Sequence, residues 1–320
     1  MLENPNFEII YEEDKVEEGD LEACKNFLST NSELKLMQMN VCSIRSKYNR
    51  ILVMLKTISD LDCMIFTEAH LKNFSHVELL SIENYSLHNT THHVRKTDGI
   101  VVFMRQGISH NIKEFIISDG NCLQIDFETG NKKFICLAIY RSPNGKQDKF
   151  LNELQIILDK MNQTCLPNTC KLLVGDINID LLKNKCKIVN QYKNIMAEAG
   201  FISLINKITR SHKDANSCID HIFIGPQKDV NCNTFILQST ISDHFTTLLN
   251  IKKDPEHNQT KKKPNSEEYM ENKKINFDNL LKDIENEKWE NILGNDNATA
   301  SISLFLENYV LILTKSILIK

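Results

Sequence analysis

The chain lacks the features that would place it in a membrane. No run of about 18 apolar residues, the length that a bilayer-spanning helix needs, occurs in its 320 residues. The closest approach, Ile302 to Ile319, contains Glu307, Asn308 and Lys315. It predicts an amphipathic helix, so we expect no membrane partner.

The chain also lacks paired cysteines and a recognisable secretory leader. Its ten cysteines are scattered, with no Cys-x-x-Cys pair and no zinc-type spacing of cysteine and histidine. The N-terminus is acidic, which does not fit a leader. We therefore expect reduced thiols and a nuclear or cytoplasmic protein that is not secreted. No repeat of 20 to 50 residues is visible, which argues against a solenoid.

Charge is distributed unevenly along the chain. The first 33 residues hold ten acidic residues against Lys15 and Lys25, while the whole chain has a net charge of −4. The remainder is therefore net positive, which suits a domain that binds a polyanion but is also ordinary for a soluble domain. We interpret residues 1–33 as an acidic, disordered arm with one short helix near Leu21 to Leu28.

From residue 34 the pattern becomes that of a globular domain with many strands and few helices. Short apolar runs predict strands at Leu36–Val41, Cys63–Phe66, Ile100–Met104, Leu123–Phe127, Phe134–Ile139, Leu172–Val174, Ile219–Ile224, Phe235–Leu237 and Phe245–Ile251. Helical spacing occurs at Ile44–Ile58, Lys149–Met161 and Lys187–Ala199. This mixture predicts an α/β fold in which a two-sheet β-sandwich is flanked by helices.

The C-terminal quarter has a different composition. Residues 252–275 are polar and rich in lysine, which indicates a linker. Residues 276–320 predict a helical segment, with helices near Asn276–Leu293 and Ala298–Ile319. Because the last helix ends in an exposed apolar stretch, we expect it to dock back, to self-associate or to pack on a further domain.

Polar residues follow several of the predicted strands. Asn40 and Glu68 each close an apolar run, where a carboxylate or amide oxygen could bind a hard cation. Each could equally be a turn or capping residue. After Leu172–Val174, Gly175 is followed by Asp176 and Asn178, which would point to the same side of an extended chain. An Asx-rich turn explains that spacing equally well.

Two Asp-His pairs precede the last strands. Asp220-His221 opens one strand and Asp243-His244 opens another. A single Asp-His pair is usually structural, but two of them downstream of the Gly-Asp-x-Asn turn favour a site. A metal, a water-activating carboxylate and a charge-stabilising histidine are what phosphodiester hydrolysis requires.

Taken in order, these motifs resemble the endonuclease/exonuclease/phosphatase superfamily over residues 34–251. The series comprises Asn40, Glu68, Tyr140-Arg141-Ser142-Pro143-Asn144, Gly175-Asp176-Ile177-Asn178, Ser217-Cys218-Ile219-Asp220-His221 and Ser242-Asp243-His244. Its forms are most similar to the endonucleases of LINE-type, non-LTR retrotransposons. The resemblance implies a deoxyribonuclease-I-like four-layer α/β sandwich that nicks double-stranded DNA. Such an element would continue into a reverse transcriptase, for which the chain has no room.

The resemblance also implies a role for each matching residue. The implied metal ligands for Mg²⁺, or Mn²⁺, are Glu68, Asn40 and Asp243. The implied catalytic residues are Asp176, which activates water, Asn178, Tyr140, and His244 oriented by Asp220. The implied DNA contacts are Asn144, Arg141, Thr209 and Ser217. One departure is Cys42, which stands where many repair members carry a second acid.

Two alternatives remain at this stage. The chain could be an abasic-site endonuclease or a phosphatase of the same superfamily. It could also be a catalytically retired fragment that binds DNA or a protein partner, which the missing polymerase favours and the intact set of motifs opposes.

Overall fold

The computed structural model describes residues 16–253, apart from residues 94, 167, 214 and 226–229, and two short strands, β16 (Lys274–Ile275) and β17 (Ile317–Leu318). The chain divides into two compact units, Met1–Glu256 and His257–Lys320. In the second unit β16 and β17 pair antiparallel. The helix predicted to run to residue 319 is therefore wrong at its end, and the linker predicted to reach residue 275 ends in a strand. The remainder of those predictions lies outside the described residues.

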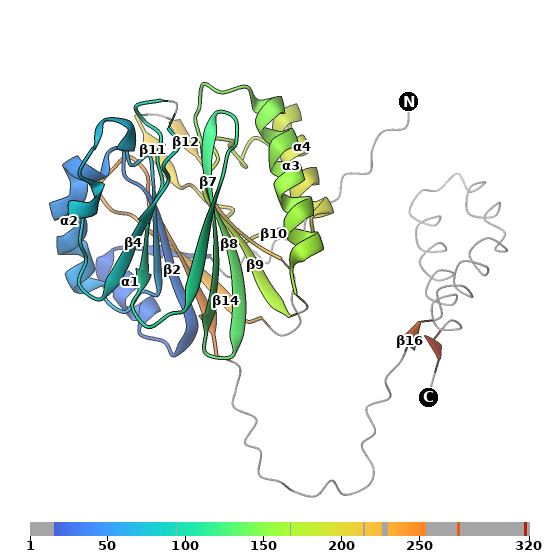
Figure 1. Ribbon diagram of the computed structural model, residues 1–320, viewed down its shortest axis with the longest axis horizontal. Helices are drawn as coiled ribbons and strands as arrows, with labels where there is room; N and C mark the ends of the chain where they lie inside the picture. The colour runs from blue at the N-terminus through green and yellow to red at the C-terminus, as the bar shows by residue number, and fades with distance from the viewer. Residues whose placement is uncertain are drawn as a thin grey trace, which may run out of the picture. The chain divides into compact units, whose positions relative to one another are not determined.

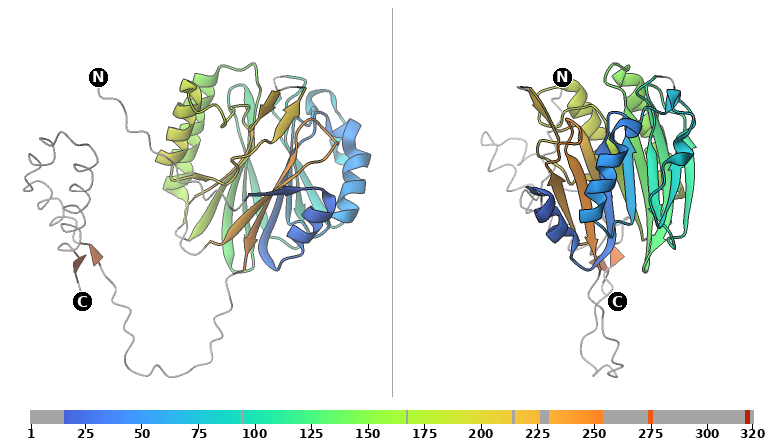
Figure 2. Two further views of the ribbon diagram at one scale, coloured as in Figure 1. Left: turned by 180° about the vertical axis from the view of Figure 1, so that it is seen from behind. Right: turned by 90° about the vertical axis from the view of Figure 1, so that its left-hand side faces the viewer.

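Two mixed β-sheets form the first unit (Figures 1 and 2). The seven-stranded sheet, in the order β1-β14-β15-β2-β3-β5-β4, consists of β1 (Val16–Gly19), β14 (Cys232–Leu237), β15 (Thr246–Lys252), β2 (Ser32–Asn40), β3 (Cys63–Thr67), β5 (Val101–Arg105) and β4 (Tyr85–Asn89). The six-stranded sheet, in the order β10-β13-β9-β8-β7-β6, consists of β10 (Ile202–Ser203), β13 (Asp220–Ile224), β9 (Thr169–Asp176), β8 (Lys132–Arg141), β7 (Gly120–Thr129) and β6 (His110–Phe115). A small hairpin of β11 (Arg210–His212) and β12 (Ala215–Ser217) lies beside them.

Helices flank the two sheets. Figure 1 shows α1 (Leu21–Leu28) and α2 (Ile44–Thr57) on one side of the sandwich, and α3 (Gln147–Thr164) and α4 (Lys187–Glu198) on the other. The helices form because buried residues recur at three- and four-residue spacing, as in α3 at Phe150, Leu151, Leu154, Ile157, Leu158 and Met161. The predicted fold class is thus confirmed. Within the described part of the chain, no helix combines the length and apolarity needed to cross a membrane.

The folded domain begins earlier than the boundary predicted at residue 34. β1 pairs in parallel with β14, and Asp20 caps α1 by accepting hydrogen bonds from the backbone of Glu22 and Ala23 at 3.1 and 3.0 Å. Phe27 of α1 packs on Phe235, with ring centroids 5.3 Å apart. Residues 16–33 are therefore part of the domain, and the short helix expected at Leu21–Leu28 is confirmed. Residues 1–15 lie outside the described chain.

Strand register brings polar side chains to one end of the sandwich. In the six-stranded sheet, Tyr140 of β8 is the register partner of Asp176 on β9, which is the partner of Asp220 on β13. In the seven-stranded sheet, β2 and β3 run parallel, so that Asn40 is the last residue of one and Glu68 directly follows the other. These two sets of residues meet between the sheets.

Candidate active site

A histidine and an aspartate from opposite sheets form a buried ion pair. His244 Nδ1 lies 2.8 Å from Asp220 Oδ2, and the two side chains are 4% and 0% exposed. Since a carboxylate accepts, Nδ1 carries a proton and Nε2 remains available to the site. Burial lowers the pKa of His244, but the negative charge of Asp220 more than offsets it and raises the pKa to about 9. The imidazole is therefore positively charged at neutral pH.

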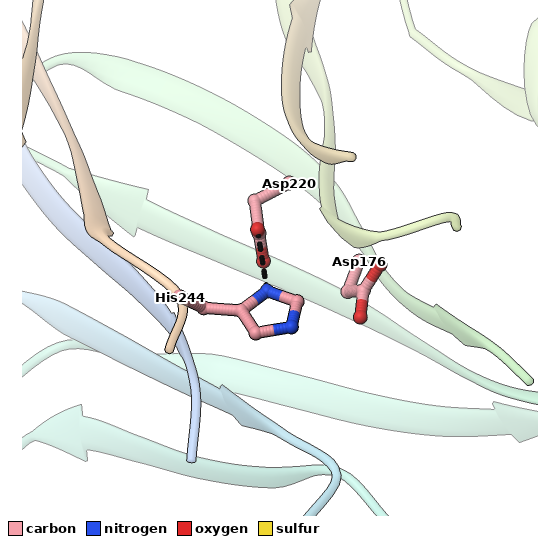
Figure 3. Close-up of side chains that lie close together, drawn as sticks. All are labelled: Asp176, Asp220 and His244. Atoms are coloured by element: carbon pink, nitrogen blue, oxygen red, sulfur yellow. Dashed lines mark hydrogen bonds and ion pairs between the residues drawn. The ribbon is translucent and has the colours of Figure 1, made fainter. Parts of the chain in front are cut away.

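Asp176 lies next to this pair. Figure 3 shows the His244 ring between the two carboxylates, with the edge that carries Nε2 turned toward Asp176. Complete burial, followed by the negative charge of Asp220, raises the pKa of Asp176 to about 7. A carboxylate with this pKa can accept a proton near neutral pH, which is what a general base requires.

Hydrogen bonds hold the Asp176 carboxylate in one orientation. Asn40 Nδ2 donates to Oδ2 at 2.7 Å, Asn178 Nδ2 donates to Oδ2 at 3.2 Å, and the Asn178 backbone donates to Oδ1 at 2.9 Å. A carboxylate has about four lone-pair positions, so one on Oδ1 stays open for water. The Asx-turn interpretation is confirmed, because β9 ends at Asp176 and Asn178 has a φ of 51°. The backbone is therefore not extended here as the other interpretation assumed, although the Asn178 side chain still reaches Asp176.

The second part of the site is an oxygen cluster, made of Asn40, Glu68 and Asp243. It surrounds the thiol of Cys42, whose Sγ lies 3.2 Å from Glu68 Oε2, 3.5 Å from Asn40 Oδ1 and 3.7 Å from Asp243 Oδ1. Burial, followed by the charges of Glu68 and Asp243, raises the pKa of Cys42, so the thiol stays protonated. Three oxygens of the kind that Mg²⁺ prefers thus converge on one small volume.

Two neighbours restrain the oxygen cluster. Tyr140 donates its hydroxyl to Glu68 Oε1 at 3.0 Å, and burial together with the charge of Glu68 raises the pKa of Tyr140. Arg210 donates to Asp243 Oδ2 through Nε at 2.9 Å, and its second guanidinium nitrogen lies 2.8 Å from the same oxygen. Burial raises the pKa of Asp243, but these hydrogen bonds outweigh burial and lower it overall. Both carboxylates keep one oxygen on the side of Cys42.

A cation could in principle be held in either part of the site. Asp176, Asp220 and His244 offer ligand atoms within 4.8 Å of one another. However, Asp220 Oδ2 and His244 Nδ1 are bonded to each other, so a cation there would have to break a buried ion pair. The oxygen cluster offers hard ligands without that cost, and its residues fit a divalent cation better.

The four residues predicted to contact DNA have different environments. Arg141 is fully buried and its guanidinium donates to the carbonyls of Ile177, Ser142 and Asn178. Thr209 is also fully buried, and its hydroxyl accepts from the backbone of Ile219 and Asp220. The guanidinium of Arg141 and the hydroxyl oxygen of Thr209 are thus bonded to backbone groups of the loops that carry the site, which gives both side chains a supporting role. Their contact with DNA stays a prediction. Asn144 is exposed and Ser217 is partly exposed, so both can contact a ligand.

Three residues that hold the site were not predicted from the sequence. Gln38 donates to Asp220 Oδ1 at 3.0 Å from inside β2. Ser242 donates to the Asn40 carbonyl at 2.8 Å and accepts from the His244 backbone at 2.9 Å. Arg210 forms the pair with Asp243 described above. Two signals were available: Gln38 is a lone polar residue within an apolar run, and Ser242 belongs to the Ser242-Asp243-His244 motif, although no role was assigned to it.

Comparison with known proteins supports the fold. No protein-family model matches the sequence, and no curated protein matches it either. Among solved structures, an endonuclease/exonuclease/phosphatase family protein from Leptotrichia buccalis is 18% identical with a TM-score of 0.52, covering 69% of this chain and 100% of that chain. A mannosyl-6-phosphatase from Bacteroides thetaiotaomicron is 15% identical with a TM-score of 0.53, covering 68% and 99%. An AP endonuclease from Archaeoglobus fulgidus is 16% identical with a TM-score of 0.53, covering 68% and 99%. At these identities the comparison establishes a shared fold, the endonuclease/exonuclease/phosphatase α/β sandwich.

Proposed function

We propose that this chain is a divalent-cation-dependent phosphodiesterase that nicks double-stranded DNA. The observation that carries the proposal is the meeting of a buried carboxylate, a positively charged imidazole and an oxygen cluster at one end of the sandwich. Each is a group that phosphodiester hydrolysis needs, and they come from β9, the end of β2, the end of β3 and the segment before β15.

Asp176 is the residue proposed to activate water. Its open position on Oδ1 accepts a proton as the water oxygen bonds to phosphorus and the ester P–O bond breaks, and the departing ester oxygen takes up a proton from solvent. Asn40 and Asn178 keep the carboxylate oriented during this step. The raised pKa of Asp176 strengthens it as a base near pH 7.

His244 is proposed to stabilise the charge that develops on the phosphoryl oxygens. Asp220 accepts from Nδ1 and so directs the protonated Nε2 toward the substrate. Mg²⁺, or Mn²⁺, held by Glu68, Asn40 and Asp243 would neutralise further charge on the phosphate. Tyr140 and Asp220 act by positioning Glu68 and His244.

A polyanionic substrate fits the surface beside the site. The β11–β12 hairpin carries Arg210, His212 and Lys213, and Arg210 forms a β-bridge with His244. The charge of Arg210 is paired with Asp243, whereas the exposed Lys213 can meet a phosphate backbone, which favours a nucleic acid as the substrate. Asn144 and Ser217 are the remaining candidates for phosphate contacts. We further propose, from the ordered motifs alone, that the domain derives from a non-LTR retrotransposon and acts in the nucleus or cytoplasm.

The proposal is tested by comparing three substrates at equal enzyme concentration. The expected order of rates is supercoiled plasmid first, with an abasic duplex and a sugar phosphate at least tenfold slower. An abasic duplex cleaved much faster than plasmid would assign the chain to abasic-site repair, and a faster sugar phosphate would assign it to the phosphatases. Tight DNA binding without any cleavage would indicate a retired binding module.

A further inference from the structure

A second cluster of metal-ligating groups lies on strands that carry none of the catalytic residues. Ser86 and His88 lie on β4, an edge strand of the seven-stranded sheet, and His110 lies on β6, an edge strand of the six-stranded sheet. All three side chains are half-buried, so an ion can reach them from solvent. The two sheets therefore meet here through side chains.

The hydrogen bonds determine where the lone pairs are. His110 Nδ1 lies 2.8 Å from the Ile108 carbonyl, which can only accept, so Nδ1 carries the proton and the neutral ring has its lone pair on Nε2. His88 Nε2 lies 2.8 Å from that atom. Ser86 Oγ donates its single proton to the Met104 carbonyl at 3.2 Å, which leaves its lone pairs for the two rings.

Two of the three separations match those of a zinc ligand set, and the third is a hydrogen bond between the two rings that the ion would replace. Ser86 Oγ lies 3.3 Å from His88 Nε2 and 3.5 Å from His110 Nε2, and the two nitrogens lie 2.8 Å apart. Zinc binds imidazole at about 2.0–2.1 Å with tetrahedral geometry, which places neighbouring ligand atoms about 3.3 Å apart. The contact between His110 Nδ1 and a carbonyl is also the support that ligating histidines usually have.

We propose that Ser86, His88 and His110 bind a divalent transition-metal ion, zinc, with water as the fourth ligand. On binding, the proton of the neutral His88 ring is exchanged through solvent from Nε2 to Nδ1, and both imidazoles then donate an Nε2 lone pair to the ion. The ion joins the edge strands of the two sheets. The site is separate from the oxygen cluster, whose ligands suit Mg²⁺.

The test is calorimetric titration of Zn²⁺ into the full chain in excess Mg²⁺, which occupies the oxygen cluster. Wild type is compared with His88→Gln, His110→Gln and the double variant, with the exposed His76→Gln as the matched control. The exposed Cys186 is present in all five proteins, so any zinc that it binds does not change the comparison between them. Each single variant should weaken one zinc site at least tenfold, the double variant should add little, and the control should match wild type.

Superimposable isotherms for wild type and folded variants would overturn the proposal and leave the histidines as a hydrogen-bonded pair. A second measurement covers variants that fail to fold. In wild-type protein carrying ¹³C-labelled histidine, one equivalent of Zn²⁺ should shift two ring signals that Mg²⁺ leaves unchanged. Ring signals that do not move with Zn²⁺ would contradict the site equally.

Discussion

The two sheets contribute to the candidate active site in different ways. The six-stranded sheet supplies Tyr140, Asp176 and Asp220 from within paired strands, in a single register row. The seven-stranded sheet supplies Glu68 and Cys42 from just beyond its strand ends, at positive φ of 50° and 41°. Residues with side chains rarely adopt such backbone angles, which cost about 1 kcal/mol or more each and gather at functional sites.

The buried groups of the site therefore differ from those of the oxygen cluster. Asp176, Asp220 and His244 are buried and each is held by hydrogen bonds to protein partners. The carboxylates of Glu68 and Asp243 are partly exposed and each turns one oxygen toward the Cys42 thiol. We infer that the acid–base groups are preorganised, whereas the oxygen cluster is completed by a cation.

The largest effect should come from removing the preorganised groups. Asp176→Asn and His244→Ala should each lower the cleavage rate by about 10²-fold or more, because one removes the base and the other the positive charge. Single-turnover plasmid nicking measures this, with the exposed Asp159→Asn as the control. Near-wild-type rates in both variants would remove this assignment.

The same groups should make stability depend on pH when no cation is bound. The pKa of His244 is raised from 6.5 to about 9, so the folded protein holds this proton more tightly than the unfolded chain. The stabilisation is complete below pH 6.5 and is lost as pH rises to 9, by roughly 3 kcal/mol in total. The pKa of Asp176 is also raised, from 3.8 to about 7, so its contribution to stability is likewise lost as pH rises, but at lower pH.

Urea unfolding in EDTA between pH 6 and pH 9.5 measures this loss. His244→Asn should flatten the profile, whereas His212→Asn, which alters a largely exposed ring, should not. If the wild-type and His244→Asn profiles run parallel, the Asp220–His244 pair does not have the proposed charge.

A smaller effect is expected in the oxygen cluster. Glu68→Gln keeps an acceptor for Tyr140 but removes the negative charge. A charge-assisted contact contributes about 1.5–3 kcal/mol, so the Mg²⁺ concentration for half-maximal activity should rise by about tenfold or more. The exposed Glu78→Gln serves as the control. An unchanged Mg²⁺ requirement would place the cation elsewhere.

The smallest effect is expected for Tyr140→Phe. It removes one hydrogen bond to Glu68 Oε1, so the Mg²⁺ requirement should rise by about threefold to tenfold while the rate at saturating Mg²⁺ is nearly unchanged. Tyr48→Phe, which loses a hydrogen bond to Ser81 outside the site, is the matched control. A large fall in the saturated rate would instead indicate that Tyr140 contacts the substrate.

The sequence predicts central strands better than edge strands. Within the two large sheets, the strands missed are β1, β4, β6 and β10, which are their four edges, and the short strands of the two small two-stranded sheets were missed as well. An edge strand pairs on one side only and tolerates polar residues, as in Tyr85–Asn89, where every residue is half-buried. Central strands are buried on both faces and give continuous apolar runs, which is why β2, β3, β8 and β9 could be identified.

The sequence identified the site residues that lie at strand boundaries. It did not show which residues of the same motifs are buried and support the site. Asp176, Asp220 and His244 are at strand boundaries within short motifs, and the structure brings them together. Arg141 and Thr209 belong to the same motifs, yet both are buried supports. Nothing in a local sequence separates an arginine that contacts DNA from one that binds backbone carbonyls.

The most direct test of the central claim is relaxation of supercoiled plasmid by the purified chain in Mg²⁺. EDTA, Asp176→Asn and Glu68→Gln are run in parallel. The account predicts nicking that EDTA abolishes, that Asp176→Asn loses at every Mg²⁺ concentration and that Glu68→Gln recovers in part at high Mg²⁺. Intact plasmid with folded wild-type protein, or nicking that survives EDTA, would contradict it.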